Sequence, residues 1–523
     1  MSGQIEKQHP HQSKIDMPIP ESKYATGQYL CNSPANLSYL HNESANASLT
    51  GCAPTYSPWN RFSNYYDSPQ VTGKPPRTST PRREQDGVHL RLVDLNLHDD
   101  SYASSAAVSN VTTFSNIFNR TGIKSSLPQW ALDGQGNVAP HVTLADVLSN
   151  DSLIEFASDK NGCRFLQEQY PAESDGGIHD EIFNKMVENS DTFLMMCRNM
   201  FGNFFVQRIV ECSRAKEQEI VMSHLRKDIY SLCLDKSACR VIQLAIQKLD
   251  IDLASQLSLQ LRGQDLVRLS IDQNGNHVVQ KIIKTLPVAA WEYVIDFFKN
   301  DDNLIAVCQD KYGCRVIQST IEKLSDNPTS PCYKQRAALL QSMMSGISRN
   351  CAQLASNEFA NYVIQHVIKS GGIMEIYRDS IIEKCLLRNL LSMSQEKYAS
   401  HVVEVAFLFA PHHLLYEMME EIFEGYVPHP ETNRDALDIL LFHQYGNYII
   451  QQMIHICRSA ITGQKELRSE HADISLYEGW LERIKERVFK NSARLERFSS
   501  GKKIIEALNR THESKFYEGA ARD

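Results

Sequence analysis

A six-residue pattern recurs eight times between residues 162 and 451, at intervals of 36 to 47 residues. Its order is a small residue, a short polar residue or Cys, a planar residue, two apolar residues, and then Gln or Glu. The eight copies begin at Gly162, Gly202, Ala238, Gly275, Gly313, Ala360, Ala399 and Gly446. On an α-helix the second, third and sixth residues share an arc of roughly 100°, and the two apolar residues point away from it. The pattern predicts a helix that buries one face and presents three chosen side chains on the other.

The third residue of every copy is planar, and we call these eight the stacking residues. They are Arg164, Phe204, Arg240, His277, Arg315, Tyr362, His401 and Tyr448. Unstacked nucleic-acid bases lie on aromatic rings and guanidinium planes, at roughly 1–3 kcal/mol per base. Arginine adds a cation–π attraction. A series of such planes suits a single-stranded ligand.

The second and sixth residues, which we call base-edge residues, form three kinds of pair. Asn pairs with Gln four times, as Asn203 with Gln207, Asn276 with Gln280, Asn361 with Gln365, and Asn447 with Gln451. Cys pairs with Gln three times, as Cys163 with Gln167, Cys239 with Gln243, and Cys314 with Gln318, and the third kind is Ser400 with Glu404. Two amides match the acceptor–donor–acceptor edge of uracil, and a Gln beside a small thiol matches adenine. A carboxylate only accepts, which matches the two adjacent N–H donors of guanine.

The recurrence, more than any one copy, favours this interpretation. A single exposed Gln is usually only solvated, and a single Cys is usually a small core residue. A period of this length indicates an all-α solenoid, whose core requires the repeated apolar residues but not the matched polar pairs. The alternative is an armadillo-like solenoid that binds protein, which would not require the matched polar pairs.

These hexapeptides resemble those of the Pumilio (PUF) family of RNA-binding proteins. The resemblance implies a right-handed α-solenoid crescent of eight three-helix repeats with capping half-repeats, which binds single-stranded RNA antiparallel to the chain. It further implies that Asn447 and Gln451 bind the 5′ uracil, and Ser400 and Glu404 the guanine after it, so that the whole site is 5′-UGUAUAUA-3′. The expected role is regulation of mRNAs through UGUA-containing elements in 3′ untranslated regions, by translational repression or mRNA decay. A PUF-type factor in ribosomal RNA maturation is a further alternative.

The sequence divides into three regions. We expect residues 1–126, rich in Ser, Asn and Pro, to be disordered, residues 127–514 to form the repeat domain with its caps, and residues 515–523 to be a tail. The segment from Leu495 to Leu508 resembles a C-terminal cap. Extra residues from Ser325 to Pro331 and from Glu424 to Arg434 predict longer loops.

Four lysines lie three residues before a base-edge residue and are candidates for phosphate contacts: Lys160, Lys236, Lys311 and Lys397. The neighbouring Asp159, Asp235 and Asp310 leave ion pairs within the protein as an equal possibility. The net charge of −8 argues against a nucleic-acid partner only if the charge is spread evenly over the surface.

The sequence also bears on metal binding, enzymatic activity, cellular location and oligomeric state. The 13 cysteines lack metal-ligand spacing, so we expect free thiols and no metal site. Neither a phosphate-binding glycine loop nor a nucleophile motif is present in the sequence, so we expect no enzymatic activity and no cofactor. With no apolar run long enough for a membrane span and no secretory signal pattern, the sequence predicts a cytoplasmic protein. We expect a monomer whose effect on RNA depends on recruited proteins, such as deadenylase or translational repressor components.

Overall fold

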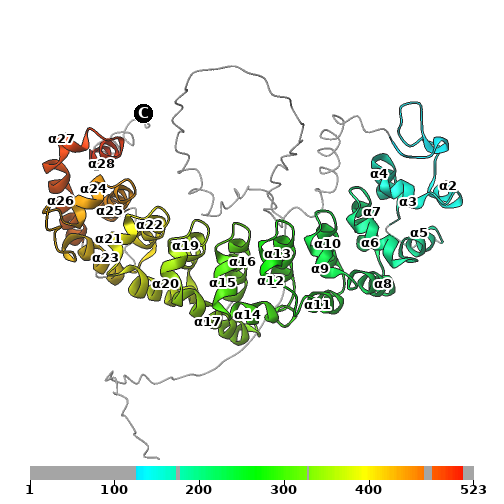
Figure 1. Ribbon diagram of the computed structural model, residues 1–523, viewed down its shortest axis with the longest axis horizontal. Coiled ribbons are helices and arrows are strands. Elements are labelled where there is room, and N and C mark those ends of the chain that lie inside the picture. The colour runs from blue at the N-terminus through cyan, green and yellow to red at the C-terminus, as the bar shows by residue number, and fades with distance from the viewer. Residues whose placement is uncertain (1–124, 172–176, 327–328, 464–473, 510–523) are drawn as a thin grey trace, which may run out of the picture. The chain divides into compact units, whose positions relative to one another are not determined.

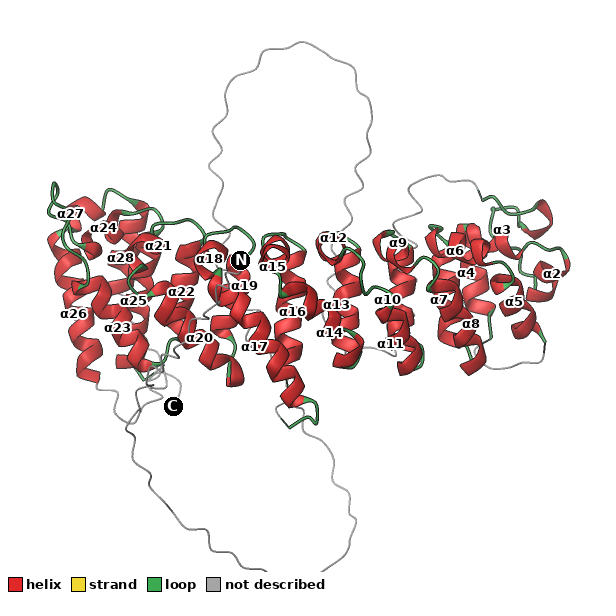
Figure 2. Cartoon of the chain, turned by 60° about the horizontal axis from the view of Figure 1, so that its bottom comes forward, coloured by secondary structure: helices red, strands yellow, loops and turns green. Residues whose placement is uncertain are grey.

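The computed structural model describes residues 125–171, 177–326, 329–463 and 474–509. The N-terminal region expected to be disordered, up to residue 124, and the tail at 515–523 lie outside these ranges. Every element named within them is helical, as Figure 2 shows, which confirms the expected all-α fold. None of these helices combines the length and the apolarity required to cross a membrane.

Eight groups of three helices follow one another, and each group supplies one helix to each of three rows. The inner row carries the hexapeptides and consists of α4 (Lys160–Gln169), α7 (Gly202–Cys212), α10 (Ala238–Lys248), α13 (Gly275–Thr285), α16 (Gly313–Ser325), α19 (Asn361–Lys369), α22 (Ala399–Phe409) and α25 (Gly446–Ile461). The outer row consists of α2 (Leu144–Ser149), α5 (Ile178–Val187), α8 (Ala215–Leu225), α11 (Ile251–Leu259), α14 (Glu292–Phe298), α17 (Tyr333–Arg349), α20 (Glu375–Ile381) and α23 (His412–Glu424). Between them lie α3 (Leu153–Ser158), α6 (Ser190–Arg198), α9 (Ile229–Leu234), α12 (Leu266–Ile271), α15 (Asp301–Cys308), α18 (Cys351–Ala355), α21 (Leu390–Ser394) and α24 (Ala436–Phe442).

Each inner helix packs against the inner helix of the next group, from α4 through to α25. In Figure 1 this row follows the concave edge of the curved array, and the outer helices follow its convex edge. The hexapeptides therefore lie side by side along one continuous surface, which is the arrangement that the period predicted.

The hexapeptide explains how the inner row is built. A Cβ atom on Gly275 would lie 2.5 Å from the carbonyl oxygen of Leu269, and one on Gly313 would lie 2.3 Å from that of Val307. The first residue must therefore be small, because the inner helix begins against the backbone of the helix before it. The two apolar residues are buried as predicted, with Val241 and Ile242 both 0% exposed, except that Phe165 in the first copy is only partly buried. Helical periodicity thus separates core residues from presented residues.

Additional elements close the two ends and fill two connections. At the N-terminal end, η3 (Gln129–Ala131) is followed by a bridge between Leu132 and Val138, and the ring of Trp130 stacks on Phe156 at 5.9 Å. The C-terminal cap is larger than the predicted segment and comprises α26 (Ile474–Lys490), α27 (Ser492–Leu495) and α28 (Ser499–Asn509). Single turns η4 (Val288–Ala290) and η5 (Gly372–Met374) precede α14 and α20, and the π-helical turn η6 (Ile382–Leu386) follows α20.

The two predicted insertions lie between helices. One separates α16 from α17, and the other separates α23 from α24. Part of the longer interval before the sixth hexapeptide lies in α17 itself, which spans 17 residues. Neither insertion interrupts the inner row, since α16 packs on α19 and α22 packs on α25. The register of the hexapeptides is therefore preserved across both.

Candidate nucleic-acid interface

Ahead of several inner helices, a side chain accepts hydrogen bonds from backbone N–H groups and fixes where the helix begins. Asp235, Asp272 and Asp310 each accept two backbone N–H groups through Oδ1, at distances of 2.7 to 2.9 Å. Within the described residues Asp235 and Asp310 use Oδ1 for these backbone bonds and form no ion pair with Lys236 or Lys311. Sequence reasoning missed this role, although an Asp or Asn directly ahead of a helical pattern is a known capping signal.

In the Asn–Gln pairs the Asn holds the Gln in place. Nδ2 of Asn276 donates to the carbonyl oxygens of Asp272 and Gln273 at 2.8 and 3.1 Å, and Asn276 is 1% exposed. Its Oδ1 accepts a hydrogen bond from Nε2 of Gln280 at 3.0 Å. The same bond, from the Gln to its Asn, measures 2.7 to 3.0 Å at Gln207, Gln365 and Gln451. The buried Asn therefore orients the Gln, which retains one N–H and acceptor capacity for the edge of a base.

In the protein alone the two amides of a pair have different hydrogen-bond partners, and contact of both with a base stays a prediction. At the first base of the expected site, for example, Nδ2 of Asn447 donates to the carbonyl oxygens of His443 and Gln444, both at 2.9 Å. Gln451 is half-buried and keeps one edge of its amide available, whereas Asn447 is 2% exposed. In the unbound protein Gln451 is therefore the more accessible amide of the pair on α25.

The Cys–Gln pairs are less uniform than the sequence predicts. Nε2 of Gln167 donates to the carbonyl oxygen and the sulfur of Cys163 at 3.1 and 3.2 Å. Nε2 of Gln318 instead donates to the carbonyl oxygen of Tyr362 in the next repeat at 3.0 Å. Gln243, half-buried on α10, forms neither kind of bond within the described part of the chain. The Gln residues of these pairs therefore share a place on the inner row but not an orientation, because a thiol holds a Gln less firmly than an Asn amide does.

The cysteines of these pairs are neutral. Burial raises the pKa of Cys163 to about 12 and the pKa of Cys239 to about 11, and it also raises the pKa of Cys314. All three are thiols at physiological pH. They supply a small neutral surface, and the Gln amide supplies the polar contacts that an adenine edge requires.

The pair in the seventh copy is acidic. Ser400 is 1% exposed and its Oγ donates to the carbonyl oxygen of Lys397 at 3.2 Å. Glu404 is 7% exposed, and its Oε1 lies 3.4 Å from Nδ1 of the stacking residue His401. A largely buried carboxylate at the sixth position can accept two N–H groups at once, as the guanine edge offers.

The stacking residues all lie on the inner helices, one residue after the first base-edge residue. Most are well exposed, and Tyr362 is 54% exposed. Several are partly engaged: Arg164 forms an ion pair with Glu168 at 2.8 Å, Phe204 packs against the hydrophobic core, and His401 lies 3.4 Å from Glu404. The structure brings the predicted planes to the concave row, and their contact with bases remains a prediction.

The candidate phosphate-binding lysines lie where the inner helices begin. Lys160 is the first residue of α4, and Lys236, Lys311 and Lys397 lie just ahead of α10, α16 and α22. The Nζ atoms of Lys311 and Lys397 lie 4.5 and 4.9 Å from the ring centroids of Tyr312 and Tyr398. These cation–π contacts hold each ammonium group beside a tyrosine ring at the start of an inner helix.

Charge is sorted between the two rows. Lys and Arg outnumber Asp and Glu in α4, α10, α13, α16, α19 and α25. Acidic residues are in excess in α5, α8, α11, α14, α20 and α23. The exceptions are α7, which is balanced, α22, which carries Glu404, and the basic outer helix α17. The net negative charge of the described helices therefore resides mainly on the outer row, and the inner row is locally suited to a polyanion.

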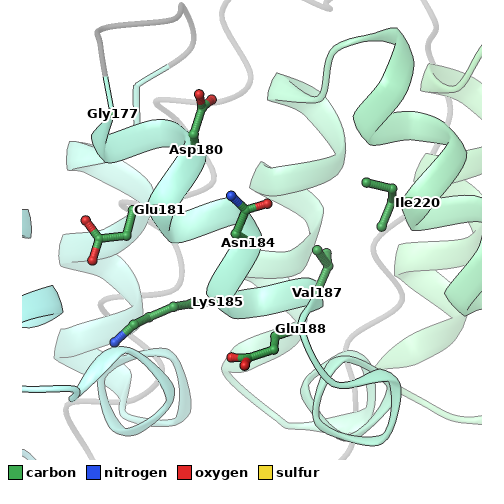
Figure 3. Close-up of a pocket in the computed structure, with 8 residues that line it drawn as sticks. All are labelled: Gly177, Asp180, Glu181, Asn184, Lys185, Val187, Glu188 and Ile220. Carbon is green, nitrogen blue, oxygen red and sulfur yellow. The ribbon is translucent and has the colours of Figure 1, made fainter.

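A hollow of about 760 Å³ lies apart from this surface, between the outer helices α5 and α8. Figure 3 shows the carboxylates of Asp180, Glu181 and Glu188 around it. Asp180 could join His179 and Glu217 as metal ligands, but Arg214 lies 2.9 Å from Asp180 and 3.7 Å from Glu217. We interpret the cluster as an ion-pair network that joins two repeats.

Comparison with known proteins agrees with the geometry of the inner row. The model of the Pumilio-family RNA binding repeat matches residues 152–168, 193–226, 228–257, 265–292, 303–332, 350–377 and 442–462. Pumilio domain-containing protein 5 of Caenorhabditis elegans is 49% identical over 436 residues, which cover 82% of this chain and 79% of that protein. The chain belongs to the Pumilio family of RNA-binding proteins. The family and the fold are those of proteins that bind RNA, as the resemblance of the hexapeptides predicted.

Two further Pumilio-family relatives extend the comparison. The crystal structure of PUF-6 in complex with 5BE13 RNA shares 52% sequence identity, with a TM-score of 0.67 over 71% of this chain and 100% of that one. Fem-3 mRNA-binding factor 2 of C. elegans is 44% identical over 396 residues, 73% of this chain and 62% of that protein. The seventh hexapeptide, Ala399–Glu404, lies between two segments matched by the family model. Its place in the array rests on α22, which packs between α19 and α25.

Proposed function

We propose that this Pumilio-family protein binds UGUA-containing elements in the 3′ untranslated regions of mRNAs and regulates those mRNAs after transcription. The proposed site is 5′-UGUAUAUA-3′, with its first base at α25 and its last at α4. The observation that carries the proposal is the contrast between α22 and its neighbours. Glu404 provides a buried carboxylate where the other seven copies provide a Gln amide, and guanine is the base whose edge offers two adjacent donors.

The proposed regulation is translational repression or mRNA decay in the cytoplasm, by a monomer that recruits deadenylase or translational repressor components. The name of Fem-3 mRNA-binding factor 2 supports an mRNA target. Base-edge pairs that are complete in all eight copies favour sequence-specific binding over ribosomal RNA maturation. They also favour RNA over the protein ligand of an armadillo-like solenoid.

A binding titration tests the proposal. We expect the full chain to bind UGUAUAUA more tightly than the same RNA with its second base changed to uracil. The preference should be at least tenfold, since one mismatched charged pair is worth about 1.5–3 kcal/mol. Equal affinities for the two RNAs would contradict the assignment of α22 to guanine.

A further inference from the structure

We propose that Ser319 determines specificity at the base bound by the fourth repeat, because it holds the Gln280 amide in one orientation. Ser319 lies on α16, in the repeat after the one that contains Gln280. Its Oγ donates to Oε1 of Gln280 at 3.2 Å, and Ser319 is 6% exposed. The inference rests on the proposed function, since it requires that Gln280 faces a base.

The orientation of Gln280 follows from a relay of hydrogen bonds with one consistent direction. Nδ2 of Asn276 donates to two backbone carbonyl oxygens, so Oδ1 of Asn276 must face Gln280. An oxygen acceptor requires a donor, so Nε2 of Gln280 turns toward Asn276. Oε1 of Gln280 then lies at the other end of the amide and accepts the hydroxyl hydrogen of Ser319. A flip of the amide would set two oxygen acceptors against each other at Asn276, and it would reverse the bond with Ser319, whose buried hydroxyl hydrogen would lose Oε1 as its acceptor.

A fixed amide distinguishes uracil from cytosine. Uracil offers a donor at N3 next to an acceptor at O4, whereas cytosine offers an acceptor at N3 next to a donor at N4. A Gln side chain pairs with either base, but the two pairings require opposite orientations of its amide. When both ends of the amide are held, only the uracil pairing remains without the loss of a hydrogen bond. Ser319 therefore adds to the preference for uracil over cytosine.

Two other Asn–Gln copies lack this second restraint. The residue that corresponds to Ser319 directly follows the last base-edge residue of the next repeat. It is Leu244 for Gln207 and Val405 for Gln365, and neither side chain carries a hydroxyl. Both of those Gln residues are still held by Asn at one end. We expect uracil to be selected over cytosine more strongly at base 5 of the proposed site than at bases 3 and 7.

The test compares Ser319→Ala with the unmodified chain on UGUAUAUA and on RNAs with cytosine at base 3 or at base 5. We expect the uracil-to-cytosine affinity ratio at base 5 to fall about three- to tenfold, the worth of one neutral hydrogen bond. The ratio at base 3 should stay constant, and Ser319→Thr should retain the preference at base 5. Thermal unfolding of each variant reports whether the array remains folded.

A second variant transfers the restraint. Val405→Thr places a hydroxyl of nearly the same shape opposite Gln365, at a position that is 9% exposed. We expect the uracil-to-cytosine ratio at base 3 to rise about three- to tenfold, with base 5 unchanged. This variant keeps the inference testable even if Ser319→Ala were unstable.

The outcomes separate this inference from the proposed function. An unchanged ratio at base 5 in Ser319→Ala, or an equal fall at bases 3 and 5, would overturn the role of Ser319. A wild-type chain that does not distinguish uracil from cytosine at base 5 would overturn it as well. Failure to prefer guanine at base 2 would instead overturn the proposed register, whatever Ser319→Ala does.

Discussion

Exchange of the acidic pair on α22 for an amide pair should change the preference at the second base from guanine to uracil. The double variant Ser400→Asn with Glu404→Gln would place at α22 the pair that four other inner helices carry. Asn fits this position in those helices because Nδ2 donates to two preceding carbonyl oxygens of the same turn. Ser400 already bonds one of the corresponding carbonyls, that of Lys397. We therefore expect the variant to fold and its Gln to be oriented as in the other copies.

The magnitude follows from the burial of the carboxylate. Glu404 is 7% exposed, so a hydrogen bond to it is a charged bond in a largely desolvated place, worth about 1.5–3 kcal/mol. A Gln at this position can accept one N–H of guanine but turns its own N–H₂ toward the other. We expect affinity for the guanine RNA to fall roughly 10- to 150-fold. The RNA with uracil at base 2 should become the preferred ligand.

Fluorescence anisotropy with RNAs that carry each of the four bases at position 2 would measure the change. The reciprocal variant, Asn361→Ser with Gln365→Glu, is a matched control and should move the preference at base 3 from uracil to guanine. Retention of guanine by the α22 variant, with normal thermal unfolding, would refute the assignment of base 2 to this helix. A loss of affinity that is equal for all four RNAs would refute the pairing mechanism.

Three further outcomes are expected. Tyr362→Ala should weaken binding by about 1–3 kcal/mol without a change in base preference, as measured with the same RNA panel, because a stacking plane contacts every base alike. Lys311→Ala and Lys397→Ala should each lower the slope of log affinity against log salt by about 0.7, as measured by titration at several salt concentrations, and unchanged slopes would exclude phosphate contacts. Cys239 should resist iodoacetamide at pH 7, and its labelling, followed by mass spectrometry, should accelerate as the pH rises toward its pKa of about 11, since only the thiolate reacts.

The rows of helices could be predicted because the hexapeptide separates its two faces by period alone. Val241 and Ile242 are buried, and the stacking residues Arg240 and Tyr362 are exposed, as an arc of roughly 100° requires. The small first residue is part of the pattern in the sequence, but its cause is not visible there. A Cβ on Gly313 would lie 2.3 Å from a carbonyl oxygen of the preceding helix, and that approach exists only in three dimensions.

The different hydrogen-bond partners of the two residues in a base-edge pair could not be predicted from the sequence. In the sequence Asn276 and Gln280 are two equivalent amides, and both are expected to face a base. The backbone carbonyls at the start of α13 accept the hydrogen bonds of Asn276 Nδ2, which leaves Gln280 as the more accessible amide of the two. Ser319 was not detected for a different reason. The hydrogen bond from Ser319 to Gln280 joins residues 39 positions apart in the sequence. The six-residue pattern made no prediction for the residue that follows each Gln.

The difference among the Cys–Gln pairs could not be predicted either. Gln167, Gln243 and Gln318 follow the same Cys at the same spacing, so the sequence predicts one geometry for all three. Only Gln167 bonds its own Cys, and Gln318 reaches a carbonyl oxygen of the next repeat instead. Because a thiol is a weak acceptor, contacts with neighbouring helices decide the orientation of the Gln side chain, and the local sequence pattern does not describe those contacts.

The separation of charge between the inner and outer rows bears on how the Glu404 carboxylate can contact a base despite the negative charge of the RNA phosphates. Glu404 would lie near the RNA backbone, and a carboxylate there is repelled by phosphate over a distance of about 10 Å at moderate salt. The two helices that pack against α22 each carry a net positive charge, from Lys369 on α19 and Arg458 on α25. His401 lies 3.4 Å from the carboxylate itself. The basic charge of the two flanking helices acts against this repulsion, so a single acidic pair is compatible with binding of a polyanion by the inner row.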